Sequence, residues 1–181
     1  MSQFWVSVSI TVLRTGVQLV LCSLGGYAFA RMPFRGRGLL FGLLLAILMV
    51  PGQSYLIGQY QLVRDLGLLE TVWGIVLPGF FSAFGVFLMR QFIRQIPREL
   101  EDAALIDGCG RWKTFFFIIL PNIRPALGAL AIIAALDSWN NFLLPLIVLN
   151  TTDLFTVPLL LSQFEGQYGG LNQGLIMAAT T

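Results

Sequence analysis

Residues 96–121 read IPRELEDAALIDGCGRWKTFFFIILP, and the rest of the chain can be interpreted outward from this stretch. Pro97 suits the first position of a helix, and the acidic residues that follow it favour the positive end of the helix dipole. Gly108 suits the left-handed position that ends a helix. Beyond it, apolar residues at i, i+3, i+4 and i+7 predict a second, amphipathic helix: Trp112, Phe115, Phe116 and Ile119. The stretch therefore predicts a helix, a glycine turn and an amphipathic helix lying at a membrane face.

The first of these helices carries a shallow face. Leu100, Ala103 and Ala104 share one side at helical spacing, and two adjacent alanines allow another surface to approach closely. From the residues alone, the pair could equally be an ordinary interfacial element that anchors the loop.

The sequence on both sides of this stretch is strongly apolar. Hydrophobic residues make up 56% of the 181 residues and charged residues 11%, with a mean hydropathy of +0.80. A soluble domain carries about a quarter charged residues, so this composition excludes a water-soluble globule. Four segments have the length and apolarity of membrane-crossing helices: 4–30, 39–57, 72–89 and 126–149. The residues from Gly174 onward resemble the start of a fifth. We expect an all-α, polytopic membrane helix bundle with four full spans.

The basic residues orient these spans. Between the first and second spans lie Arg31, Arg35 and Arg37, and the loop between the third and fourth spans carries six more basic residues. Only Arg64 lies in the loop between the second and third spans. Because Lys and Arg concentrate in cytoplasmic loops, residues 97–121 are predicted to face the cytoplasm, and 150–173 the outside.

Some residues depart from the pattern of continuous apolar helices. Arg14 lies within the first span; we expect it to snorkel to the outer headgroups, with a role in the transport path as the alternative. Pro51, Pro78 and Pro145 are expected to kink or end their helices.

A polar cluster interrupts the fourth span. Asp137, Trp139, Asn140 and Asn141 lie about 11 residues or more into that helix, near the membrane midplane. A charge there is costly against lipid, so the cluster should face a watery cavity or a partner subunit. Carboxylate and amide groups beside an aromatic ring suit sugar recognition, which makes these four residues candidates for a solute path. Holding two helices together is the alternative. Gln53, Ser54 and Gln59 are weaker candidates that could simply meet outside water.

Several kinds of site are not expected. The sequence contains no histidine and two isolated cysteines, so we expect no metal site and no cofactor. It lacks the Gly-x-x-x-x-Gly-Lys-[Ser/Thr] loop, so ATP should be hydrolysed by another polypeptide and this chain should not be an enzyme. A formal net charge of +2 does not suggest nucleic acid.

The loop resembles the EAA loop of ATP-binding cassette importer permeases. The family pattern is Glu-Ala-Ala, three residues, Gly, nine residues and Ile-x-Leu-Pro, and this chain matches it with Asp102, Ala103, Ala104, Gly108, Ile118, Leu120 and Pro121. The one departure is Asp102 in place of the usual Glu, which keeps the charge and shortens its reach. Further segments resemble the carbohydrate-uptake branch: YAFAR at 27–31, FLMRQF at 87–92, IPREL at 96–100 and SWNNFLLPLIV at 138–148.

The resemblance implies a permease domain over residues 1–181 of the type I importer kind, in a bacterial inner membrane. It implies a coupling helix that docks on a cytoplasmic ATP-binding subunit through Glu101, Asp102, Ala103, Ala104, Asp107, Gly108, Leu120 and Pro121. It further implies a second permease subunit, making a heterodimer surrounded by lipid, and an extracytoplasmic solute-binding protein. Family members have six spans, so we expect this chain to lack the first span and most of the last.

The residues leave alternatives to sugar import open. The solute could be glycerol phosphate, a peptide or an ion, although a phosphate would need converging arginines at mid-depth, and Arg14 is the sole basic residue there. A membrane assembly protein without a transport role is the alternative from a different class.

Overall fold

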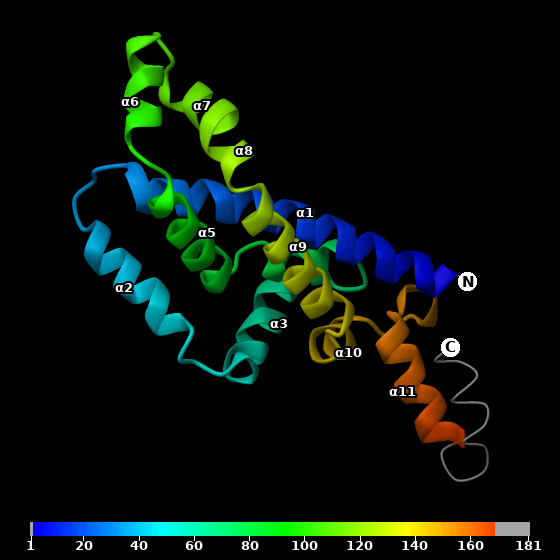
Figure 1. The fold of residues 1–181 in the computed structure, drawn as a ribbon. Coiled ribbons are helices and arrows are strands. Elements are labelled where there is room, and N and C mark those ends of the chain that lie inside the picture. The colour runs from blue at the N-terminus through cyan, green and yellow to red at the C-terminus, as the bar shows by residue number, and fades with distance from the viewer. Residues whose placement is uncertain (1, 169–181) are drawn as a thin grey trace. The chain divides into compact units, whose positions relative to one another are not determined.

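The computed structural model describes residues 2–168, and each element in that range is a helix or a helical turn (Figure 1). In chain order they are α1 (Ser2–Arg31), α2 (Arg37–Ile47), η1 (Gly52–Tyr55), α3 (Leu56–Asp65), α4 (Val72–Val76), η2 (Leu77–Gly79), α5 (Ala83–Gln95), α6 (Glu99–Ile106), α7 (Arg111–Thr114), η3 (Phe115–Ile119), α8 (Leu120–Asn122), α9 (Arg124–Trp139), α10 (Leu143–Val148), η4 (Thr152–Leu154) and α11 (Val157–Tyr168). The all-α expectation is confirmed. The fifth span expected from Gly174 lies outside the described residues.

The chain forms two compact units. Among the described residues, unit 1 comprises 2–14, 52–79 and 135–168, and unit 2 comprises 15–51 and 80–134. The long helices α1 and α9 each contribute residues to both units.

The helices are more broken than the expected spans. Among the described residues, α1 alone is long and apolar enough to cross a membrane, and the number rises to four if each bent helix pair counts as one span. The expected span at 39–57 is not one helix, because α2 ends at Ile47 and helical structure resumes at Gly52. Pro51 lies in this gap, where it lacks an amide hydrogen and disfavours helical geometry in the residue before it.

The other two prolines lie within short helical elements. Pro78 is in the 3₁₀ turn η2, ahead of the break before α5. Pro145 occupies the first turn of α10, where its missing amide hydrogen costs least. The segment 126–149 divides between α9 and α10, with the break directly after Trp139.

Unit 2 is held together by the close approach of α1 and α5. A Cβ at Gly26 would lie 2.5 Å from Cβ of Met89 and 2.9 Å from the backbone nitrogen of Arg90. A Cβ at Gly25 would meet the Val86 side chain at 3.2 Å. The packed residues around this crossing form one core: Cys22, Tyr27, Val86, Met89, Ile93, Phe115, Ile119, Ile123, Ala126 and Leu130. Small residues in α1 therefore set how closely the two helices pack.

In unit 1 the side chain of Glu70 joins two loops. Its carboxylate accepts hydrogen bonds from the backbone N–H of Asn150 at 2.7 Å, from Nδ2 of Asn150 at 2.7 Å and from the backbone N–H of Thr151 at 3.1 Å. Glu70 has a φ of 57°, in the left-handed region that a side chain rarely adopts. The three hydrogen bonds explain why this conformation is tolerated.

These bonds also determine the pKa of the Glu70 carboxyl. Desolvation raises that pKa, but the hydrogen bonds from Asn150 and Thr151 together outweigh it and hold the pKa below its ordinary value. The carboxylate therefore contributes stability above its ordinary pKa, and this contribution is lost as the pH falls through the lowered value.

We expect Gly26→Ala to destabilise the chain by about 1–3 kcal/mol, because the new methyl group overlaps the backbone and Cβ of α5. The matched control is Gly16→Ala in the same helix, where a Cβ meets nothing within 4 Å. It should be neutral or stabilise by up to about 1 kcal/mol through helix propensity. Unfolding of the full chain by sodium dodecyl sulfate, followed by circular dichroism, measures both. Equal effects of the two substitutions would contradict the close crossing.

We expect Glu70→Gln to lower the unfolding midpoint near pH 7, because an amide group replaces one acceptor oxygen and turns a donor toward the loop N–H groups. The difference from wild type should shrink at about pH 3, below the ordinary glutamate pKa of about 4.3. Asp65→Asn, an exposed acid in the same segment, should show neither effect. A pH-independent loss in Glu70→Gln would show that the charge of the carboxylate is not what matters.

Candidate functional site

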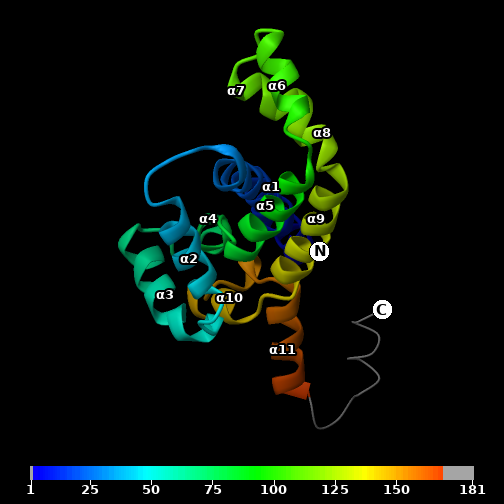
Figure 2. The ribbon, with the colours of Figure 1, turned by 60° about the vertical axis from the view of Figure 1, so that its left-hand side comes forward.

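Residues 97–121 form the helix pair that their sequence predicts. Helix α6 ends at a left-handed Gly108, whose φ is 78°. The backbone N–H of Cys109 bonds to the carbonyl of Ala104 at 2.8 Å, which closes the end of the helix. Helices α6 and α7 lie side by side within unit 2 (Figure 1; Figure 2). The expected order of helix, glycine turn and helix is confirmed.

The apolar stripe expected on the second helix is wrong in part. Phe115 and Ile119 are buried, but Trp112 and Phe116 are 67% and 52% exposed. Residues 115–119 form a π-helical turn, which widens the backbone and divides the stripe into two pairs. The exposed pair stacks, with ring centroids 6.4 Å apart. Two aromatic rings are therefore presented outward beside α6.

The expected docking residues divide between an outer and an inner face of α6. Asp102, Ala103, Asp107 and Gly108 are exposed, whereas Ala104 is buried in unit 2. Of Leu100, Ala103 and Ala104, which were expected to share one face, Ala104 alone is buried, so α6 packs inward through Ala104 and leaves its alanine neighbour outside. Further along the loop, Leu120 and Pro121 are half-buried.

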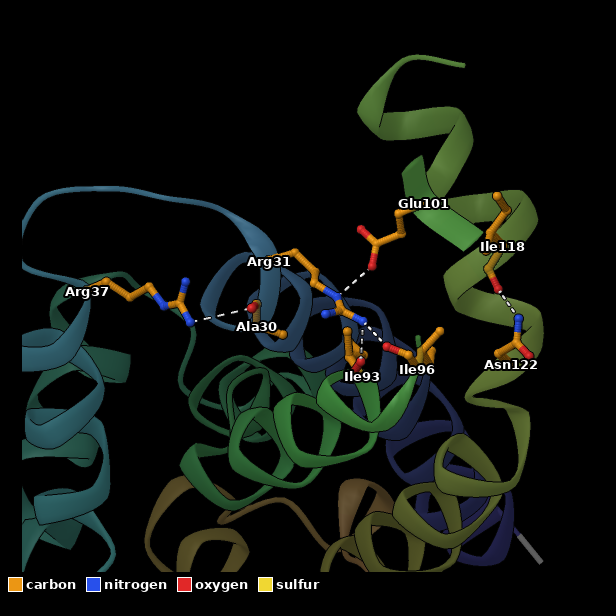
Figure 3. A network of polar contacts seen from close by, with 8 residues as sticks. All are labelled: Ala30, Arg31, Arg37, Ile93, Ile96, Glu101, Ile118 and Asn122. Atoms are coloured by element: carbon orange, nitrogen blue, oxygen red, sulfur yellow. Dashed lines mark hydrogen bonds and ion pairs between the residues drawn. The ribbon is translucent and has the colours of Figure 1, made fainter. Parts of the chain in front are cut away.

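Arg31, the last residue of α1, connects three elements of unit 2 (Figure 3). Its Nε forms an ion pair with Oε1 of Glu101 at 2.5 Å. Its Nη2 donates to the carbonyls of Ile93 at 3.0 Å and Ile96 at 2.5 Å, at the end of α5. The two charged side chains are only 8% and 13% exposed. Glu101, expected on the docking surface, therefore points inward and ties α6 to α1 and α5.

Two further hydrogen bonds drawn in Figure 3 lie near the Arg31–Glu101 pair in unit 2. Arg37 donates to the carbonyl of Ala30 at 3.4 Å, and Asn122 donates to the carbonyl of Ile118 at 2.7 Å. A cavity of about 200 Å³ opens beside the ion pair, and its lining includes Tyr27, Arg31, Arg98, Glu101, Asp102 and Arg111. Burial raises the pKa of the Glu101 carboxyl above its ordinary value, although Arg31 and Arg98 pull it the other way.

A larger polar cavity lies in unit 1. Its volume is about 590 Å³, and its polar lining comes from three stretches of chain: Arg14, Gln53, Tyr55, Gln59, Asp137, Asn140 and Asn141. Three of the four expected solute-path residues thus line one cavity, together with two of the glutamines given less weight. Trp139 does not line it, because its ring packs edge-on against Phe4 with centroids 6.0 Å apart.

Arg14 pairs with an acid in α9. Its Nη2 lies 2.7 Å from Oδ2 of Asp137, and the side chains are 12% and 68% exposed. The guanidinium lies against Gly79, where a Cβ would come within 1.9 Å of its Nε. A nearly buried charge needs a partner of opposite sign, and Asp137 supplies it.

Sequence reasoning missed the pairing of Arg14 with Asp137 and of Arg31 with Glu101. The Arg14–Asp137 pair could have been predicted, because two opposite charges that each lie inside an apolar segment are expected to meet. No comparable signal marked Arg31, since an arginine at the cytoplasmic end of a span is ordinary.

Comparison with known proteins decides the family. A family model described as "Binding-protein-dependent transport system inner membrane component" matches residues 23–181. The chain belongs to this family of transporter permeases. The resemblance of the cytoplasmic loop to importer permeases is thereby confirmed.

Relatives in this family cover nearly all of the chain. It is 41% identical to the arabinooligosaccharides transport system permease protein AraQ of Halalkalibacterium halodurans, over 97% of the chain and 61% of that protein. It is 37% identical to the lactose transport system permease protein LacG of Rhizobium radiobacter, over 97% of the chain and 66% of that protein. The chain therefore spans less than two thirds of the length of these permeases.

The permease fold is shared with a solved structure. A chain in the crystal structure of a bacterial ABC transporter, involved in the import of the acidic polysaccharide alginate, superposes with a TM-score of 0.81. The match covers 99% of this permease and 62% of that chain at 24% identity. The expected importer-permease architecture is confirmed.

We expect Arg31→Gln to destabilise this permease by about 3 kcal/mol or more, because it leaves the buried Glu101 carboxylate and two helix-end carbonyls without their shared cation. Glu101→Gln should cost less, since Arg31 keeps its bonds to the carbonyls of Ile93 and Ile96 and since the raised pKa of the Glu101 carboxyl shows that burial already disfavours its charge. Unfolding by sodium dodecyl sulfate measures both.

Arg37→Gln is the matched control, because Arg37 makes longer bonds of 3.3 and 3.4 Å to the carbonyls of Met32 and Ala30. It should have less than half the effect of Arg31→Gln. A comparable loss for both arginines would argue that Arg31 does not organise unit 2.

Proposed function

We propose that this chain is the greater part of a permease subunit of an ATP-driven bacterial sugar importer, crossing the cell inner membrane several times. Membership of the permease family supports the transport role, and relatives named for arabinooligosaccharides and lactose support a sugar as the solute. The observation that carries the proposal is the helix pair α6–α7, which has an exposed outer face and an inner face anchored by Arg31.

The outer face of α6 is proposed to dock on a separate ATP-binding subunit. Asp102 and Ala103 are exposed there, and Ile106 is 86% exposed, which is unusual for isoleucine in contact with water. A small residue between an acid and an apolar side chain suits a groove that accepts a helix. Asp107, Gly108, Leu120 and Pro121 would complete the contact, while Glu101 and Ala104 would support it from behind.

Arg31 is proposed to carry the movement of α6 into the membrane helices. When the ATP-binding subunits close and shift α6, the ion pair with Glu101 and the bonds to the end of α5 would make α1 and α5 move with it. Rigid-body rocking of packed helices is the general mechanism for alternating access.

The cavity of about 590 Å³ is proposed to form part of the solute path. Its carboxylate and amide groups can bind sugar hydroxyls, and Tyr55 offers a ring. A phosphate solute is less well supported, because Arg14 is the cavity's one cation among the described residues and is already paired. The alternative of a membrane assembly protein has no comparable support.

Other partners follow from the family. A second permease subunit and lipid would cover the exposed apolar side chains of α2, which include Leu39, Leu43 and Ile47. An extracytoplasmic binding protein would deliver the solute.

We expect Ala103→Glu to abolish co-purification of the ATP-binding subunit and sugar uptake, because a longer, charged side chain would occupy the docking face of α6. Gln95→Glu is the matched control: it adds the same charge at an exposed position at the end of α5. Both variants should be extracted as folded protein. Unchanged assembly and uptake in Ala103→Glu would refute the docking proposal.

A further inference from the structure

The cavity in unit 1 contains a charge pair in an otherwise neutral polar lining. Gln53, Gln59, Asn140 and Asn141 are amides and Tyr55 is a phenol, so Arg14 and Asp137 are its charged groups among the described residues. They contact each other at 2.7 Å, which makes the lining neutral overall.

The two members of the pair are not equally available to a ligand. The Arg14 side chain is 12% exposed, and its Nε and Nη1 are buried without a hydrogen-bond partner. The Asp137 side chain is 68% exposed. The guanidinium therefore stabilises the carboxylate from behind, while the carboxylate presents its negative charge to the cavity.

Gly79 keeps Arg14 in this position. The guanidinium occupies the space that a Cβ on residue 79 would fill, at 1.9 Å from Nε and 2.7 Å from Cζ. Arg14 can therefore lie flat against the η2 turn, where it can reach Asp137 and where its remaining N–H groups are turned away from solvent.

We propose that the Arg14–Asp137 pair sets the charge selectivity of this cavity, so that it accepts uncharged sugars and rejects carboxylated ones. This inference rests on the proposed sugar-import function. Sugar hydroxyls can donate to the exposed Asp137 carboxylate and exchange hydrogen bonds with the four amides. A sugar carboxylate would instead meet the Asp137 charge across a short distance, while the compensating cation is covered.

Removing the negative charge should reverse this preference. In Asp137→Asn the cavity loses its carboxylate, and Arg14 becomes an uncompensated cation beside it. A sugar carboxylate in this variant would gain an attraction to Arg14 and lose the repulsion from Asp137. For charges about 4 Å apart near a protein surface, this should change the ratio of acidic to neutral sugar affinity by about tenfold or more.

The test is saturation-transfer NMR on the full chain, assembled with its partner permease and ATP-binding subunit in detergent. The probes are galactotriose and glucotriose, each with its uronate counterpart oxidised at C6. We expect the wild type to favour the neutral sugar of a pair, and Asp137→Asn to shift the affinity ratio toward the uronate by at least about tenfold.

Asp153→Asn is the matched control, since it removes the same charge from an exposed position outside the cavity lining. It should leave the ratio unchanged. Should Asp137→Asn fail to fold, Asn140→Asp tests the same idea in reverse, because a second carboxylate on the lining should weaken uronate binding further.

The outcomes separate this inference from the proposed function. An affinity ratio that is equal in wild type, Asp137→Asn and Asn140→Asp would overturn the charge-selectivity inference while leaving sugar binding intact. If no probe of either charge binds to the wild-type assembly, the cavity is not a sugar site and the inference fails. Docking on the ATP-binding subunit would still be judged by Ala103→Glu.

Discussion

A nearly buried guanidinium has to be neutralised, and both units depend on meeting this requirement. Arg31 is 8% exposed and is satisfied by Glu101 and by two carbonyls at the end of α5. Arg14 is 12% exposed, and its charge is neutralised by Asp137. Removing either acid would leave a nearly buried arginine without its counter-charge, at a cost of several kcal/mol. Each arginine therefore determines which elements must meet around it.

The two pairs differ in what they leave exposed, and this difference suits them to different roles. Both members of the Arg31–Glu101 pair are buried, so the pair acts as a joint between α1, α5 and α6. In the other pair, Arg14 is covered while Asp137 is open to a cavity. A buried joint suits the transfer of movement, and a half-exposed pair suits selection among solutes. We therefore propose that the same type of interaction serves mechanical coupling in unit 2 and recognition in unit 1.

Glycines allow these arrangements, each for a separate physical reason. Gly26 lets α1 and α5 approach until a Cβ would overlap the neighbouring backbone. Gly79 leaves the space in which the Arg14 guanidinium lies. Gly108 adopts a positive φ that ends α6 and turns the chain into α7. A side chain larger than hydrogen at these positions would respectively separate two helices, displace a charge and strain a turn.

The properties that depend on local spacing and on composition could be predicted from the residues alone. The low charge content excluded a soluble globule, Gly108 predicted the end of α6, and the spacing from Asp102 to Pro121 identified the permease family. These features depend on neighbours along the chain or on residue totals, so they can be recognised without knowing which segments meet. The same information predicted that Asp137, Asn140 and Asn141 would need a polar environment.

Tertiary structure decided which partners these residues have. The π-helical turn at 115–119 divided the expected apolar stripe, and packing turned Glu101 and Ala104 inward while Ala103 stayed outside. Residues 14 and 137, and residues 31 and 101, are far apart in sequence and meet only once their helices pack. The energy of an ion pair depends on the distance between its charges and on their burial. Local spacing along the chain gives neither quantity, so the two charge pairs could be identified only in the folded structure.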